Sequence, residues 1–124
     1  MNKRNRTIPT IRFSFFNHRI HISKAVLYAI GSPAYIQIII TPDNKTLYVK
    51  KCLDRVFDRF AVPRRVYTDG IFVFGLQKTA FAEAVLIKMG WDKNGIYRIY
   101  GESITEDVMA FKLDEAERID KENK

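Results

Sequence analysis

Apolar and polar residues alternate in two stretches near the start of the chain. Residues 11–16 place an apolar side chain at every second position until Phe15 and Phe16 break the pattern, and residues 20–22 repeat the alternation around His21. A period of two is typical of a strand that buries one face. The pattern therefore predicts two successive strands, each with a polar outer face.

A short helix is predicted to follow, over residues 24–30. Its larger apolar residues recur at a spacing that places them on one helical face, and Ser23 is a suitable N-cap. Gly31 can adopt the left-handed conformation that ends many helices, and Pro33 prevents the helix from continuing. Both ends of this helix are therefore predicted.

A two-stranded hairpin is predicted after the helix. Residues 35–41 are β-branched and aromatic, residues 42–45 favour a turn, and residues 47–50 return as the second strand. The uncharged stretch 25–42 has 18 residues, which is near the length of a membrane-spanning helix. Because glycine, serine and proline interrupt its middle, a helix followed by a strand is the better prediction.

The second half of the chain repeats this order of elements. Residues 18–31 align without gaps on residues 77–90, with Ala-Val-Leu identical at 25–27 and 84–86. After a three-residue insertion, the hairpin also finds a counterpart before the C-terminus. We infer a two-copy repeat of about 45 residues per copy. In the second copy we expect a strand at 71–74, a helix at 79–89, and hairpin strands at 96–100 and 108–113.

A single domain is expected, because 124 residues with 47% hydrophobic composition suffice for one core. Its fold class is α+β, mainly β, with pseudo-twofold symmetry between the copies. Leu53, Val56, Phe57 and Phe60 are spaced as one face of an amphipathic connector helix. The expected divisions are a basic arm at 1–10, repeat 1 at 11–52, the connector at 53–68, repeat 2 at 69–116 and a frayed tail at 117–124.

The repeat and the periodicities also predict the shared core. Its members are Val26, Ile30, Tyr35, Ile38, Ile40, Val49, Leu86, Met89, Ile99 and Phe111. Trp91 is expected to pack over the end of the second helix.

Residues 18–31 and the following hairpin resemble the core of the AbrB, MazE and MraZ swapped-hairpin family. Its signature is roughly Gly-Arg-Val-x-Ile-Pro, a short helix, a glycine and a two-stranded arm. The matching residues are Arg19, Ile20, Ile22, Ile30 and Gly31. The resemblance implies that the two copies interlock into one small barrel, as in the MraZ type. It also implies a DNA-binding transcriptional regulator, and a homodimer is compatible with it.

Charge is unevenly distributed along the chain. Residues 1–65 carry 13 Lys and Arg against three acids, a net +10, whereas residues 66–124 carry eight against 11, a net −3. A basic segment attracts phosphates or an acidic surface. We therefore expect the first half to contact duplex DNA. The candidate contacts are Arg4, Arg6, Arg12, Arg19, Lys24, Lys50, Lys51, Arg64 and Arg65.

Catalytic chemistry finds little support in the sequence. His18 and His21 are three apart on a predicted strand, so their side chains point to opposite faces and do not chelate one metal ion. The lone Cys52 is expected to be a small packing residue in a reducing compartment. No nucleophile and base are paired in a recognisable motif. We expect a cytoplasmic, non-enzymatic protein without cofactor or metal.

A second class of function stays open. Ser23 stands where the family usually has proline, and Leu27 and Tyr28 stand where DNA-binding members often carry arginines. These departures favour a small interaction module, such as a phage or mobile-element accessory protein, that binds an acidic protein or ribonucleoprotein surface. The salt dependence of binding to duplex DNA separates the two classes.

Overall fold

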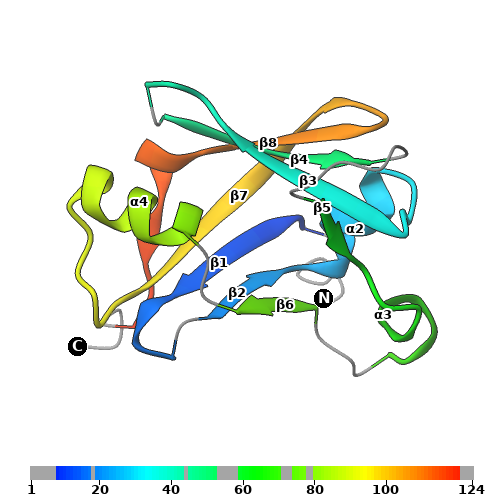
Figure 1. Ribbon diagram of the computed structural model, residues 1–124, viewed down its shortest axis with the longest axis horizontal. Helices are drawn as coiled ribbons and strands as arrows, with labels where there is room; N and C mark the ends of the chain where they lie inside the picture. The colour runs from blue at the N-terminus through cyan, green and yellow to red at the C-terminus, as the bar shows by residue number, and fades with distance from the viewer. Residues whose placement is uncertain are drawn as a thin grey trace.

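A single curled sheet dominates the structure, a computed structural model that describes residues 8–17, 19–43, 45–52, 59–70, 74–77 and 80–120. The sheet bends into a half-barrel, and helices lie against it (Figure 1). The expected α+β, mainly β class is therefore confirmed. The strands are β1 (Thr10–Ser14), β2 (Arg19–Ile22), β3 (Tyr35–Ile40), β4 (Thr46–Lys51), β5 (Arg59–Ala61), β6 (Gly75–Gln77), β7 (Ile96–Thr105), β8 (Val108–Lys112) and β9 (Glu117–Arg118). The helices are α2 (Lys24–Ala29), α3 (Arg65–Thr68) and α4 (Ala80–Met89), with 3-10 turns η1 (Phe15–Asn17) and η2 (Leu113–Glu115).

The strand order brings distant parts of the chain together. Within the described residues the sheet runs β5-β3-β4-β8-β7-β1-β2-β6, and β9 pairs with β7. Neighbours in the sheet are antiparallel throughout. Helices α2 and α4 lie at opposite ends of the curled sheet (Figure 1). Strand β1 is thus held between its sequence neighbour β2 and the distant β7.

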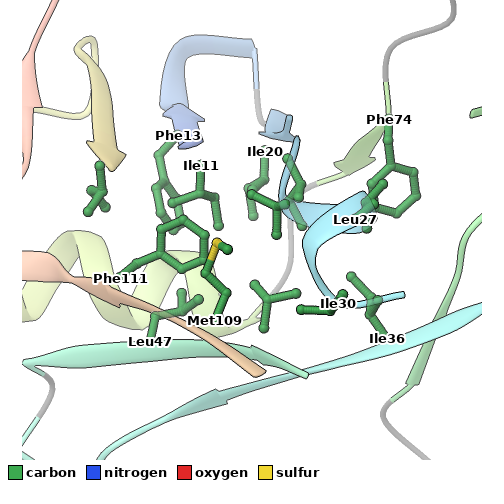
Figure 2. Packing of buried hydrophobic residues seen from close by; sticks show 14 of the residues in the cluster. Ile11, Phe13, Ile20, Leu27, Ile30, Ile36, Leu47, Phe74, Met109 and Phe111 are labelled. Carbon is green, nitrogen blue, oxygen red and sulfur yellow. The ribbon is translucent and has the colours of Figure 1, made fainter. Parts of the chain in front are cut away.

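The core fills the inside of the curl (Figure 2). Ile11 and Phe13 of β1 point inward and are fully buried, as the alternating pattern predicts. Phe111, Met109 and Leu47 come from the opposite part of the sheet to meet them (Figure 2). Of the predicted core residues, those in the buried cluster are Val26, Ile30, Val49, Ile99 and Phe111, and those packed against it are Ile38, Ile40 and Met89.

Elements of the first repeat agree closely with the sequence expectation. Helix α2 and strand β3 divide the uncharged stretch 25–42, as expected, and no helix within the described part of the chain is long and apolar enough to cross a membrane. The strand expected at residues 11–16 ends at Ser14, because the chain tightens into η1 where Phe15 and Phe16 break the alternation.

Helices α2 and α4 end in the same way. Gly31 and Gly90 follow them with φ of 94° and 67°, the left-handed conformation that glycine adopts without strain. The N–H of each glycine donates to the carbonyl three residues earlier, at 3.1 and 3.2 Å. The N–H of the next residue donates to the carbonyl five residues earlier, at 2.8 and 3.1 Å. Residues matched in the repeat alignment therefore close both helices.

Ser23 acts differently from the expected cap. Its side chain makes no capping hydrogen bond to α2. Instead the Oγ of Ser23 accepts a hydrogen bond of 2.9 Å from the backbone N–H of Thr10, and the Ser23 N–H donates back to the Thr10 carbonyl at 3.0 Å. The hydroxyl thereby links the start of β1 to the end of β2. It pairs the backbone N–H of Thr10, which would be costly to leave without an acceptor.

The prediction of a helical connector is wrong at its C-terminal end. Phe60 lies in the short strand β5, which pairs with β3, and not on a helix. Helix α3 then forms beyond Pro63. Hydrogen-bonding to the edge of β3 outweighs the helical spacing of the apolar residues, since propensity is a weak constraint beside tertiary pairing. Residues 53–58 lie outside the described part of the chain.

The second repeat departs further from expectation. Strand β6 begins at Gly75, after the residues where a strand was expected, and Phe74 precedes it as a buried residue outside any strand. Residues 71–73 lie outside the described part. Strand β7 extends to Thr105, well past the expected end at residue 100.

The expected tail contributes to the sheet. Strand β9 pairs with β7, and Arg118 forms ion pairs with Asp92 at 3.0 Å and Asp120 at 2.9 Å. Asp120 also accepts a hydrogen bond of 3.0 Å from the Ile96 N–H. The tail expectation is therefore wrong for residues 117–120, because these contacts order a polar segment that has little apolar surface to bury.

Candidate anion-binding surface

Basic side chains gather on the outer face of strands β1, β2 and β7. Because Ile11 and Phe13 point into the core, Arg12 between them points outward. In the antiparallel register Arg12 lies opposite His21 of β2 on one side and opposite Arg98 of β7 on the other. With Arg19, two residues before His21 and on the same face, these side chains form what we call the basic row: Arg12, Arg19, His21 and Arg98.

Gly75 provides the space in which two members of the basic row meet. It lies opposite His21 in the pairing of β6 with β2. A Cβ atom at this position would lie 2.9 Å from Nη2 of Arg19 and 3.5 Å from Cδ2 of His21. The guanidinium of Arg19 and the imidazole of His21 therefore both reach over a glycine whose missing side chain leaves room for them.

Arg12 and His21 are in contact across β1 and β2, and two nearby arginines affect the pKa of the imidazole. Nη2 of Arg12 lies 3.4 Å from Nδ1 of His21. Because arginine has only donors, this contact is a hydrogen bond only while His21 is neutral and its Nδ1 accepts. Partial burial lowers the pKa of His21 below 6.5, and the charges of Arg12 and Arg19 lower it further.

The positive charge of the basic row is only partly neutralised. Arg98 forms an ion pair of 2.9 Å with Glu117 of β9. Among the described residues, no carboxylate forms an ion pair with Arg12 or Arg19. Like charges directly opposite on neighbouring strands are destabilising. An anion placed over Arg12 would relieve this repulsion.

Arg19, the second arginine of the basic row on β1 and β2, is partly buried. Its Nε atom is shielded from solvent and makes no hydrogen bond within the described structure. A guanidinium fork suits the planar, bidentate recognition of phosphate or carboxylate oxygens. Turning Arg19 toward such an anion would break no hydrogen bond at Nε.

The lowered pKa of His21 predicts a pH dependence of stability. Unfolding restores the ordinary pKa near 6.5, so the unfolded chain binds more protons than the folded one between the two values. The free energy of unfolding should therefore fall as the pH drops through 6.5 toward the folded pKa. Urea unfolding at pH 7.5 and 5.5 measures this loss, which His21→Gln should reduce. An equal loss in this variant would assign the effect to other groups.

The other basic residues predicted to contact DNA lie away from the basic row or already have hydrogen-bonding or ion-pair partners. Lys24 donates from Nζ to the carbonyl of Asp69 at 2.8 Å, and Arg65 forms a 3.2 Å ion pair with the carboxylate of the same residue. Lys50 and Lys51 belong to β4, which β8 and β7 separate from β1. Arg64 is exposed beside α3, while Arg4 and Arg6 lie outside the described residues. Only Arg12 and Arg19 of the predicted set belong to the basic row.

Two members of the basic row, His21 and Arg98, are not among the contacts predicted from the sequence. From the sequence His21 is considered only as a candidate metal ligand, and Arg98 belongs to the half with a net charge of −3, outside the half that is expected to contact DNA. The alternation around Arg98, between buried Tyr97 and Ile99, indicates its outward direction. No local signal indicates that β7 pairs with β1.

A metal centre finds no support in the described part of the chain. No group of three or more histidine, cysteine, aspartate or glutamate side chains is placed there to hold an ion. Cys52 is buried, in keeping with the expected packing role. The acidic residues Glu106 and Asp107 form the exposed turn between β7 and β8.

Comparison with known proteins adds no assignment. The chain matches no family model, and neither the curated proteins nor the solved structures contain one that is significantly similar to it. Inference about its function therefore depends on the basic row and on the arrangement of the strands.

Proposed function

We propose that the protein is non-enzymatic and binds duplex DNA through backbone phosphates, as a transcriptional regulator of the swapped-hairpin type. The observation that carries the proposal is the register of β1, which sets Arg12 directly between His21 and Arg98 on an exposed face. Arginine and histidine so placed, with no ion pair between Arg12 and a carboxylate in the described part of the chain, form a surface that favours an anionic partner. Phosphate contacts of this kind position a protein on DNA without reading its sequence.

The proposal includes an internal duplication with a local twofold axis. Strand β4 pairs with β8, its counterpart in the repeat alignment, and Tyr48 lies directly opposite Ala110. Strand β2 pairs with β6, and each of these strands precedes the helix of its own repeat. In the sheet the pair β3-β4 of the first copy is followed by β8-β7 of the second, β1-β2 of the first and β6 of the second, which supports interlocking. The matching closures of α2 and α4 by Gly31 and Gly90 support it further.

The salt dependence of DNA binding tests the proposed function. Replacing Arg12 and Arg19 together with glutamine should weaken binding to random-sequence duplex DNA. It should also flatten the logarithmic salt slope by about 0.9 for each phosphate that the variant no longer neutralises. The measurement is a fluorescence anisotropy titration at several salt concentrations.

A charge-matched control separates a local surface from net charge. Lys88→Gln with Lys112→Gln removes the same two charges from exposed positions on α4 and β8. This variant should keep the native slope. If the two double variants bind alike, or the native protein ignores duplex DNA at low salt, the DNA-binding proposal is wrong. An interaction module for an acidic protein surface then becomes the better interpretation.

A further inference from the structure

We propose that Arg12, Arg19 and His21 form a binding site for one phosphate group, and that His21 takes up a proton when the phosphate binds. This inference rests on the proposed function and deepens it, since it names the ligand group and couples its binding to pH. The three side chains come from the adjacent strands β1 and β2, over the gap that Gly75 leaves in β6.

The geometry brings donors of three side chains to one place. Arg12 contacts Nδ1 of His21, and Arg19 lies next to the same imidazole above Gly75. All three side chains project from one face, because Ile20 and Ile22 on either side of His21 are buried. A phosphate oxygen that replaces His21 as the acceptor for Arg12 leaves Nδ1 free to carry a proton.

Charges around His21 explain the coupling. Arg12 faces it from β1, Arg19 from its own strand β2, and Arg98 lies beyond Arg12 on β7, with Glu117 of β9 as its partner. Strand β6 places the uncharged Gly75 opposite His21 and the uncharged Gln77 opposite Arg19. Without an anion, this positive surrounding disfavours imidazolium. A bound phosphate reverses the local field, so one proton is taken from solution as the complex forms.

The direct test is a histidine titration by NMR, with inorganic phosphate as the probe and chloride as the reference at equal ionic strength. His18→Gln is the background, since it leaves His21 as the only histidine in the chain. The titration midpoint of His21 should rise when phosphate replaces chloride. An unchanged midpoint would overturn the proposed site.

Gly75→Ala tests the geometry without changing any charge. The new methyl group must displace the guanidinium of Arg19, because 2.9 Å is too close for that contact. Displacing the end of a flexible side chain costs the fold little, and circular dichroism checks that the variant is folded. The rise in the His21 midpoint with phosphate should become smaller. A rise equal to that of the background protein would show that Arg19 plays no part.

Binding to DNA at different pH values distinguishes a site for backbone phosphate from a site for free phosphate. Affinity for random-sequence duplex DNA should increase between pH 7.5 and pH 5.5, with a limit of about tenfold per pH unit for one proton taken up. His21→Gln should flatten this dependence, and His18→Gln, the matched control, should keep it. DNA binding that is independent of pH would overturn the coupling and leave the proposed function standing. A midpoint shift with phosphate but no DNA binding would overturn the proposed function and leave the phosphate site standing.

Discussion

Replacing Phe111 with alanine should lower the free energy of unfolding by about 3–5 kcal/mol, as truncation of a fully buried phenylalanine does. Its side chain is completely buried between the two parts of the sheet, where Phe13, Leu47 and Met109 surround it (Figure 2). The loss combines the transfer free energy of the ring with the cavity it leaves. Urea unfolding followed by the fluorescence of Trp91 measures it, since that indole packs against Phe13 with ring centres 5.7 Å apart.

Leu86→Ala is the informative comparison. The sequence places Leu86 in the core, but it is only partly buried and lies outside the buried cluster, whereas the preceding Val85 is completely buried. We therefore expect Leu86→Ala to cost less than about 2 kcal/mol, because truncation there leaves a smaller cavity. If both substitutions shift the unfolding midpoint equally, the orientation of α4 in the structure is wrong.

Gly101→Ala should lower the free energy of unfolding by about 1–3 kcal/mol through overpacking. Gly101 lies opposite Phe111 in the pairing of β7 with β8. A Cβ atom there would lie 2.6 Å from Sδ of Met109 and 2.7 Å from Cε2 of Phe111. Both neighbours are buried in the core, so neither side chain moves aside without disturbing others.

Gly70→Ala is the matched control for overpacking. Among the described residues, a Cβ atom at Gly70 would meet nothing within 4 Å beyond its chain neighbours, and the φ of Gly70 is not in the left-handed region. The free energy of unfolding should change by less than about 0.5 kcal/mol. A large loss at Gly70, or none at Gly101, would contradict the packing described for these two sites.

Local elements of the first repeat follow from its sequence with short-range physics alone. Alternation predicts β1 and β2, the apolar face and Gly31 predict α2, and the turn at residues 42–45 predicts the hairpin of β3 and β4. Each depends on residues close together in the chain, where side-chain direction and backbone freedom decide the conformation. The outward direction of Arg12 and Arg19 follows from the same alternation.

Elements with little local pattern could not be predicted. Strand β6 has three residues, too few to show a period, and β9 has two polar residues that pair with β7. At Phe60 the local pattern is clear but misleading. The spacing of the apolar residues before it favours a helix, whereas Phe60 pairs with the edge of β3 as part of β5. In these places hydrogen-bonding to a distant strand decides the structure.

The sequence by itself determined the order of strands and helices in residues 11–52, the glycines that end α2 and α4, and the surface position of Arg12 and Arg19. Only the tertiary structure decided which strands became neighbours. The pairing of β1 with β7 brings Arg98 from the acidic half beside Arg12, and the pairing of β2 with β6 places Gly75 opposite His21. The physical reason is that strand pairing is long-range. It is selected by burying complementary apolar faces in one core, and periodicity within a single strand carries no information about its partner.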